Sequence, residues 1–323
     1  MKNLKKLISV VLSVVMVASF LVVGTSAASY PDVEETASYS AAVELLSALD
    51  ILKGDENGNF NPDAEIKRSE FAAVVCRALG QENAATSSVS KFDDVAANHW
   101  AVGYIGWAAG KGIVNGYGDG TFGPDKAVSY QEAVKMIMAA LGYGKLAENK
   151  GGYPYGYLSL AGTYGVTAGL SANPTEAAPR SLVAQLIYNA LEAPLMDTSY
   201  YSTTEERYVV YDGSKAADYE ERTILSQYLD IIKVRAKVVA NYKTDSGLWK
   251  KNGRPMVKVD FLKAYNESDK DYEEIGTSTN VGYVYKTGIK VFEGETDAAD
   301  FLAQTVDAYL FYNEDDALEL KAL

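Results

Sequence analysis

The chain has 323 residues, 48% of them hydrophobic and 23% charged, which leaves room for two or three domains and excludes a wholly disordered protein. Acidic residues outnumber basic ones by 43 to 30, for a net charge of −13, so a protein that coats nucleic acid through a basic surface is excluded. One Cys and one His exclude a disulfide framework and a Cys/His zinc site.

A secretory signal peptide is predicted for residues 1–28. Three lysines within the first six residues precede an apolar run over residues 7–23, and small residues follow it over residues 25–28. As a helix the run would extend only about 26 Å, which favours a cleaved signal over a permanent membrane anchor. We therefore expect an exported protein with no membrane span after cleavage. Its net charge would be −16, because the signal carries three Lys and no acid.

Residues 30–192 contain an internal repeat. A shift of 62 residues places Tyr30 on Phe92 and then holds without a gap for fifty residues. It matches Ile51 with Ile113, Gly54 with Gly116, Gly58 with Gly120, Phe60 with Phe122, Pro62 with Pro124, Asp63 with Asp125 and Glu70 with Glu132. A third, eroded copy follows with a central loop three residues shorter. The sequence thus predicts three structural units, residues 29–84, 85–146 and 147–198, which share one core because a single unit could not bury its apolar face.

Each copy is predicted to fold as helix, glycine loop, helix. The second helices carry apolar residues at helical spacing: Phe71, Val74, Val75, Ala78 and Leu79 in copy one, Ala133, Met136, Ile137, Ala140 and Leu141 in copy two, and Val183, Leu186, Ile187, Ala190 and Leu191 in copy three. The first helices are shorter and are expected near residues 40–49, 102–109 and 155–161.

The motifs of copy two are Phe92 to Val95, Trp100, and the glycine-rich segments 112–116 and 118–124. In this order they resemble the S-layer homology (SLH) domain, specifically in copies one and two and more weakly in copy three. The resemblance covers about half of the chain. It implies a pseudo-threefold helical domain that attaches exported proteins to secondary polysaccharide of the bacterial cell wall, often through pyruvylated sugars.

The resemblance also implies where a polysaccharide would bind. An Arg fork can hold a pyruvate carboxylate through paired charge-assisted hydrogen bonds while an aromatic face covers the sugar ring. Arg68 and Arg180 occupy the family's arginine position, whereas copy two has Tyr130 there, so at most two sites keep the guanidinium. The candidate polysaccharide-binding residues are Arg68, Lys67, Trp100, Asp119, Arg180 and Tyr153.

Several of these positions also have structural explanations. Glu70, and Ser129 with Glu132, are predicted to cap helix starts, whereas Arg68 and Arg180 have no capping role and are either ligand-binding or solvated surface residues. Trp100 is either a platform for a sugar ring or a lid on the core.

Three further features favour structural roles. The segment 55–59 and the matching loop at 117–122 are expected to be Asn/Asp-Gly turns, because the spacing of an EF-hand calcium loop is absent. His99 is expected to be a surface or capping residue. Cys76 aligns with Met138 and is expected to be a small packed hydrophobe. No metal site and no cofactor are predicted.

Beyond residue 198 the helical repeat stops. Residues 199–222 are predicted to form a linker, and residues 223–323 a small β-rich domain, sandwich or partial barrel, that starts with a short helix near 223–229. Hydrophobic residues alternate at period two over 234–240 and 257–261. Two strand pairs are expected, one over 282–291 and one joining 308–312 to 318–320. The predicted fold class is therefore multidomain α+β, with an α-helical pseudo-threefold repeat domain followed by a small mainly-β domain.

Three functions remain open. The first is a non-enzymatic wall-attached protein of the bacterial surface, whose repeats bind secondary cell-wall polysaccharide and whose β domain displays or contacts other surface proteins. The second is a structural subunit of an S-layer lattice. The third is a wall-anchored glycan hydrolase, because acidic residues are plentiful and such chemistry needs two carboxylates.

Overall fold

Each sequence copy forms its predicted pair of helices in the computed structural model. The structure describes residues 30–196, 200–202, 207–209, 222–241, 256–266, 271–274, 289–293, 305–312 and 318–322, so the predicted signal peptide lies outside the described residues. The first helices of the copies are α2 (Ser40–Ala48), α5 (Val102–Gly110) and α8 (Tyr155–Thr163), and the second helices are α3 (Arg68–Ala78), α6 (Tyr130–Ala140) and α9 (Arg180–Leu191). Two short helices that the sequence did not predict, α4 (Glu82–Thr86) and α7 (Gly144–Asn149), follow α3 and α6.

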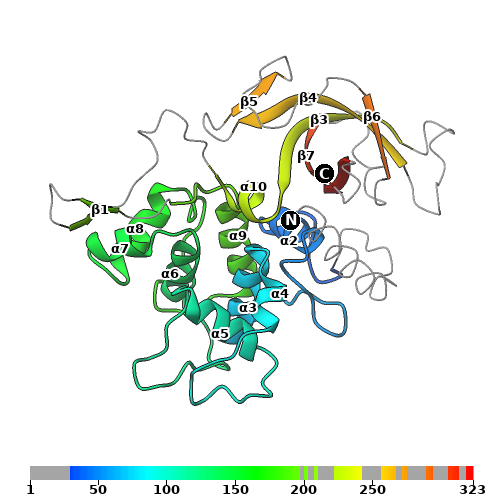
Figure 1. Cartoon of the computed structure of the whole chain (residues 1–323). Helices are drawn as coiled ribbons and strands as arrows, with labels where there is room; N and C mark the ends of the chain where they lie inside the picture. The colour runs from blue at the N-terminus through cyan, green and yellow to red at the C-terminus, as the bar shows by residue number, and fades with distance from the viewer. Residues whose placement is uncertain are drawn as a thin grey trace, which may run out of the picture.

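The three repeats close into a ring. The second helix of each repeat packs on the first helix of the next, α3 on α5, α6 on α8, and α9 back on α2 (Figure 1). At the centre, three buried residues that precede the second helices exchange backbone hydrogen bonds in a cycle. The Ile66 N–H donates to Ala178 O (3.2 Å), the Ala178 N–H to Val128 O (2.8 Å), and the Val128 N–H to Ile66 O (2.9 Å). This cycle confirms the pseudo-threefold arrangement implied by the resemblance.

The apolar stripes of the second helices supply the common core. Phe71, Ala133 and Val183, which are equivalent by the repeat register, are each 0% exposed, and one continuous hydrophobic cluster runs through all three repeats. Phe60 and Phe122, from the glycine loops of the first two repeats, are also fully buried. Since each stripe faces its neighbours, the burial that stabilises one repeat depends on the other two.

C-terminal to the ring, a short helix leads into two sheets. Helix α10 (Ile224–Tyr228) forms within the predicted helical segment. The strands are β1 (Tyr200–Ser202), β2 (Arg207–Val209), β3 (Ile231–Asn241), β4 (Met256–Asn266), β5 (Asp271–Glu274), β6 (Ile289–Glu293), β7 (Thr305–Tyr312) and β8 (Leu318–Ala322). Strands β1 and β2 form an antiparallel pair within the predicted linker.

The remaining strands form one antiparallel sheet in the order β5-β4-β3-β7-β8, and β6 pairs with β4 beside β5. Strand β7 pairs with β8, with Leu310 opposite Leu320. The sheet curves (Figure 1), and β6 comes into contact with β8. The predicted hairpin over 282–291 is described only in its second half, because residues 275–288 lie outside the described part.

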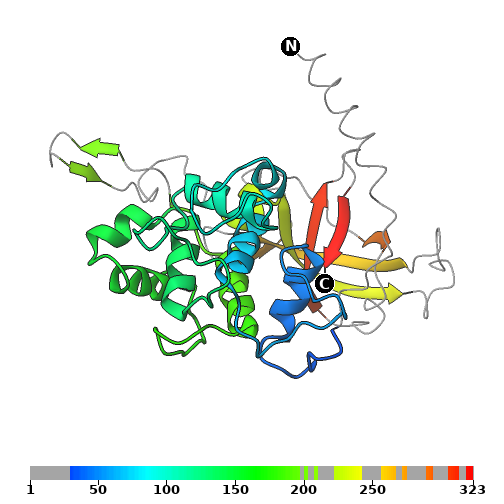
Figure 2. The same cartoon turned by 90° about the horizontal axis from the view of Figure 1, so that it is seen from below.

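The sheet meets the ring at α2, which contacts β8, and at α10, which contacts both β3 and α9; Figure 2 shows the blue helix α2 beside the red strands. Lys233 of β3 forms a largely buried ion pair with Glu192 just after α9, with 2.6 Å between Nζ and Oε1. Gly80, which ends α3 with φ +61°, lets the Tyr228 carbonyl of α10 approach so closely that a Cβ would lie 2.6 Å from that oxygen. Side chains of α10, β3 and β7 extend the helical core: Ile224, Leu225, Ile231 and Tyr309.

Candidate functional site

The ring has three inter-repeat junctions, and the candidate binding residues are distributed over them. The first junction lies between α3 and repeat 2, the second between α6 and repeat 3, and the third between α9 and repeat 1. At each one, the N-terminus of a second helix meets the glycine loop of the following repeat. The N–H of Arg68 donates to Lys126 O, that of Tyr130 to Glu176 O, and that of Arg180 to Ala64 O.

Arg68 ties the first junction together. Its side chain is only 5% exposed. Nε donates to Phe122 O (2.8 Å), Nη2 donates to Asn115 O (3.0 Å), and Nη1 pairs with Glu132 Oε1 (2.8 Å). The guanidinium also lies over the Tyr117 and Phe122 rings, with Cζ 4.9 and 4.7 Å from their centroids. Arg68 therefore has a structural role that the sequence did not predict, because its fork satisfies two loop carbonyls and a carboxylate from repeat 2.

Arg180 makes the equivalent contacts at the third junction with one difference. Nε donates to Phe60 O (2.7 Å), Nη2 donates to Lys53 O (2.8 Å), and Cζ lies 4.9 Å from the Phe60 centroid. Phe60 and Lys53 match Phe122 and Asn115 by the shift of 62 residues. No carboxylate pairs with Arg180 among the described residues, and its side chain is half-buried. Neither arginine is the solvated surface residue that the sequence left open.

The second junction replaces the arginine by Tyr130, which is 7% exposed, and burial raises the pKa of its phenol. Tyr153 stands just before α8 and is 42% exposed. Burial raises the pKa of the Tyr153 phenol and the Glu132 carboxylate adds to this shift, while hydrogen bonds with Gln131 and Ser129 oppose it. Tyr153 therefore lies beside the Arg68–Glu132 pair, where the first two junctions meet.

The other candidate residues lie apart from this pair. Lys67 forms an exposed ion pair with Asp125 (3.0 Å), which raises the pKa of its ammonium. Asp119 accepts hydrogen bonds from the Thr121 hydroxyl (2.6 Å) and backbone N–H (2.9 Å), and these lower its pKa. Trp100 is 57% exposed, so it is not a lid on the core.

The predicted capping residues occupy helix starts. Glu70 Oε2 accepts from the Lys67 N–H (2.9 Å), and Glu132 Oε2 accepts from the Ser129 N–H (2.9 Å). The Ser129 hydroxyl donates to the same Glu132 oxygen at 2.9 Å. Glu132 thus combines its capping role with the ion pair to Arg68, because its two oxygens face different partners.

The structure supports the roles predicted for His99, Cys76 and Asp55. His99 Nδ1 accepts from the Ala101 N–H (3.1 Å) at the start of α5. Cys76 is 0% exposed, and burial raises the pKa of its thiol to about 12. Asp55 forms a turn by accepting from the N–H groups of Asn57 and Asn59, both at 2.9 Å. Among the described residues no group of His, Cys, Asp or Glu could hold a metal ion, and no helix is long and apolar enough to cross a membrane.

The sequence did not single out two lysines that lie on aromatic rings. Lys126 Nζ is 4.4 Å from the Tyr117 centroid, and Lys135 Nζ is 5.2 Å from the Tyr153 centroid. Tyr117 and Tyr153 are both partly exposed. The first two junctions therefore present aromatic surface beside positive charge, an arrangement that suits an anionic sugar.

The S-layer homology domain model matches residues 29–72 and 91–134, which belong to the first two repeats. A cell surface protein of Thermoanaerobacter kivui is 31% identical over 333 residues, which cover 99% of this chain and 40% of that protein. A middle cell wall protein of Brevibacillus brevis is 32% identical over 58% of this chain and 17% of its own length. A surface layer protein of Brevibacillus choshinensis is 29% identical over 80% of this chain and 22% of its own length. The chain thus spans two fifths or less of the length of these relatives.

Proposed function

This chain is a secreted, cell-wall-associated protein with S-layer homology domains, and we propose that its three-repeat ring anchors it non-covalently to secondary polysaccharide of a bacterial cell wall. The ligand would be a carboxylate-bearing saccharide, pyruvylated in the form that the family resemblance implies. Arg68, Lys67, Trp100, Asp119, Arg180 and Tyr153 remain the proposed binding residues, and the junctions are the proposed binding surfaces. We further propose that residues 223–323 form a small, mainly-β module that is displayed at the cell surface and contacts other surface proteins.

The observation that carries this proposal is the combination of the domain match with the closed ring. Ring closure brings Arg68, Glu132 and Tyr153 from three repeats to one place, which no single repeat could do. Tyr117 and Tyr153 are 46% and 42% exposed there, so a sugar ring has apolar faces to stack on. The net charge of residues 29–198 is −9, from 11 basic and 20 acidic residues. Recognition of an anionic polymer would therefore rely on local contacts rather than on long-range attraction.

A retention experiment tests the proposal. The chain from residue 29 to 323 is mixed with native wall sacculi, with sacculi stripped of secondary polysaccharide, and with native sacculi in the presence of the extracted polysaccharide as a free competitor. We expect retention on native sacculi, loss on stripped sacculi and competition by the free polysaccharide. Equal retention on native and stripped sacculi would show that the polysaccharide is not the ligand. Removal of ketal groups from the polysaccharide then tests the pyruvate requirement.

A second candidate function is a structural subunit of a surface lattice, which is favoured by the similarity to a surface layer protein. The relevant measurement is electron microscopy of the purified chain at rising concentration. Ordered two-dimensional sheets would support a lattice subunit. A monodisperse monomer at the highest concentration would argue against it and leave anchoring as the proposed function.

A further inference from the structure

Lys135 is a half-buried cation whose charge is not matched by an acid. It lies on α6, with Nζ 5.2 Å from the centroid of Tyr153 and 6.0 Å from that of Tyr157. Arg68, Arg77, Lys67 and Lys233 each pair with a carboxylate. Within the described part of the chain, no carboxylate oxygen lies within 4.0 Å of Lys135 Nζ. Lys111 and Lys126 also have no carboxylate within this distance among the described residues, but both are exposed. Lys135 is half-buried, so its charge is less well solvated and gains more from a bound anion.

Lys135 lies in repeat 2, the repeat that has no arginine at the start of its second helix. The repeat register places Lys135 at the same position as Ala73 in repeat 1 and Gln185 in repeat 3. Gln185 there donates to Ser38 O (3.2 Å), so it serves the contact between α9 and α2. The repeats with an uncharged residue at this position have Arg68 or Arg180 at the helix start, whereas repeat 2 has Tyr130 there. Each second helix therefore brings at least one cation to its junction: α3 brings Arg68 and also Arg77, which lies over Tyr104 of α5, α9 brings Arg180, and α6 brings Lys135 from five residues further along than the arginine position.

We propose that Lys135 and Tyr153 form an anion-binding subsite at the second junction, which takes the carboxylate of a wall saccharide. This inference rests on the proposed anchoring function and assigns it a residue outside the family's arginine position. The ammonium has three N–H donors, and its neighbours are the Tyr153 and Tyr157 rings, 5.2 and 6.0 Å from Nζ. The guanidiniums of Arg68 and Arg180 already donate to loop carbonyls. Lys135 is thus free to form a charge-assisted hydrogen bond at no cost to the fold.

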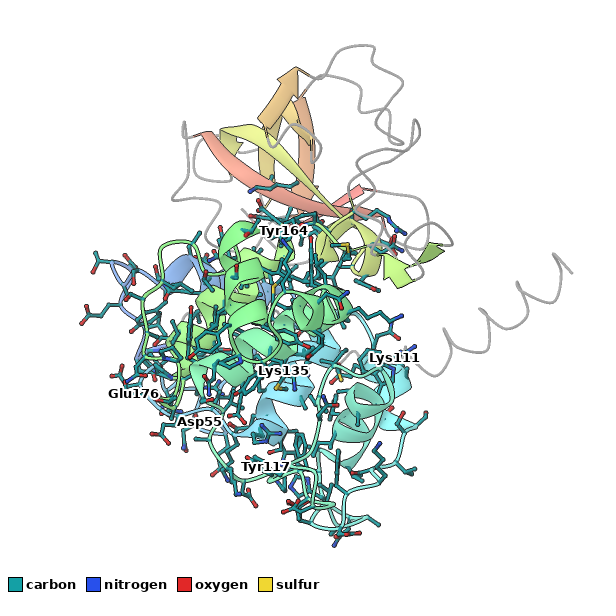
Figure 3. The ribbon with its side chains drawn as sticks, turned by 90° about the vertical axis from the view of Figure 1, so that its left-hand side faces the viewer. Asp55, Lys111, Tyr117, Lys135, Tyr164 and Glu176 are labelled. Carbon is teal, nitrogen blue, oxygen red and sulfur yellow. The ribbon has the colours of Figure 1, made fainter. Side chains whose placement is uncertain are left out.

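Tyr153 supplies the second half of the subsite. Its ring, just before α8, lies beneath the Lys135 ammonium of α6, and Tyr153 is 42% exposed. The Tyr153 phenol lies close enough to Gln131 and Ser129, at the start of α6, for both to lower its pKa. A sugar ring that stacks on the exposed part of Tyr153 would bring an attached carboxylate toward Lys135. Figure 3 labels Lys135 near the middle of the helical region, between Tyr117 and Tyr164, with Lys111 to its right.

The test compares Lys135→Met with Lys111→Met in the chain from residue 29 to 323. Lys111 is a matched control because its Nζ lies 5.9 Å from the Trp107 centroid, so both changes remove one positive charge from an aromatic ring. Retention on native sacculi is measured for both variants and for Lys135→Arg. In parallel, methyl glucuronide and methyl glucoside, which differ by a carboxylate, are titrated while the NMR signals of the Tyr153 ring are followed.

We expect Lys135→Met to weaken retention about tenfold or more, the effect of one lost charge-assisted hydrogen bond. Lys111→Met and Lys135→Arg should bind within about twofold of the parent chain. Methyl glucuronide, and not methyl glucoside, should shift the Tyr153 signals, and Lys135→Met should abolish that shift. Melting temperatures should agree within about 3 °C because no ion pair is broken.

The outcomes separate this inference from the anchoring proposal. If the parent chain binds sacculi and Lys135→Met binds equally well, the subsite is refuted and anchoring stands. If the parent chain fails to bind sacculi, the anchoring proposal is refuted. The glucuronide titration then decides the subsite alone, and an unchanged Tyr153 spectrum refutes it.

Discussion

Replacement of Arg68 by Ala is expected to destabilise the ring strongly, although Arg68 is a candidate ligand residue. The change removes hydrogen bonds to Phe122 O and Asn115 O and leaves Glu132 without its cation. Loss of one partner from a buried ion pair costs about 3 to 5 kcal/mol. Since the Arg68 and Glu132 side chains are 5% and 24% exposed, we expect a cost of about 3 kcal/mol, near the lower end of this range.

The assay is urea unfolding followed by circular dichroism, with calorimetry on the same samples. For a domain of 150 to 250 residues, a loss of about 3 kcal/mol lowers Tm by about 6 to 12 °C. Arg180→Ala is the matched control, because it removes the equivalent two carbonyl contacts but no ion pair. We expect Arg180→Ala to cost about 1 to 2 kcal/mol.

A double-mutant cycle isolates the ion pair. Glu132→Gln keeps an oxygen for the helix cap and removes the charge that pairs with Arg68. We expect a coupling energy of about 1 to 3 kcal/mol between the two changes. The reasoning is refuted if Arg68→Ala unfolds within about 0.5 kcal/mol of Arg180→Ala, or if the two changes in the cycle are additive. Either result would show that the ion pair with Glu132 does not contribute to the stability of the ring.

Three further predictions concern single positions. Gly80→Ala should lower the free energy of unfolding by about 2 to 3 kcal/mol, because φ is +61° and the new Cβ would lie 2.6 Å from the last carbonyl oxygen of α10. Gly112→Ala, with φ +71° and no atom within 4 Å of the new Cβ, should cost only about 1 kcal/mol. Equal losses of unfolding free energy for the two variants in calorimetry would argue against a close contact between Gly80 and the Tyr228 carbonyl. The pKa of Asp119 is lowered by hydrogen bonds from Thr121, so its stabilising effect is present above the unfolded pKa and is lost as the pH falls through the lower folded value. NMR titration should place the Asp119 midpoint below that of an unfolded peptide, and Thr121→Ala should raise it; an unchanged midpoint would contradict the turn. Cys76, with a pKa of about 12 and no exposed surface, should resist a thiol reagent until urea unfolds the chain, and rapid labelling of the native protein would show that it is accessible.

The helices of the repeats followed from the sequence because their signals are local. The stripe that begins at Phe71 recurs at Ala133 and Val183, and all three residues are buried as expected. The turn at Asp55 and the capping residues Glu70 and Glu132 also depend on neighbours within a few positions. Helices α4 and α7 were missed because five or six residues are too few to show an apolar period.

The roles of the cationic residues were decided only by the tertiary structure. The partners of Arg68 are separated from it by 47, 54 and 64 positions, so no spacing in the sequence could reveal that a residue at a helix start holds two repeats together. Lys135 was overlooked because it is ordinary in sequence, and only the structure shows it half-buried against two tyrosine rings. The spacing of apolar residues and the chemistry of the turns act over a few residues, so the sequence by itself determined the three helical pairs. Packing of each repeat against the next decided which charges became buried, as for Arg68 between repeats 1 and 2, and which were left without an acid among the described residues, as for Lys135 between repeats 2 and 3.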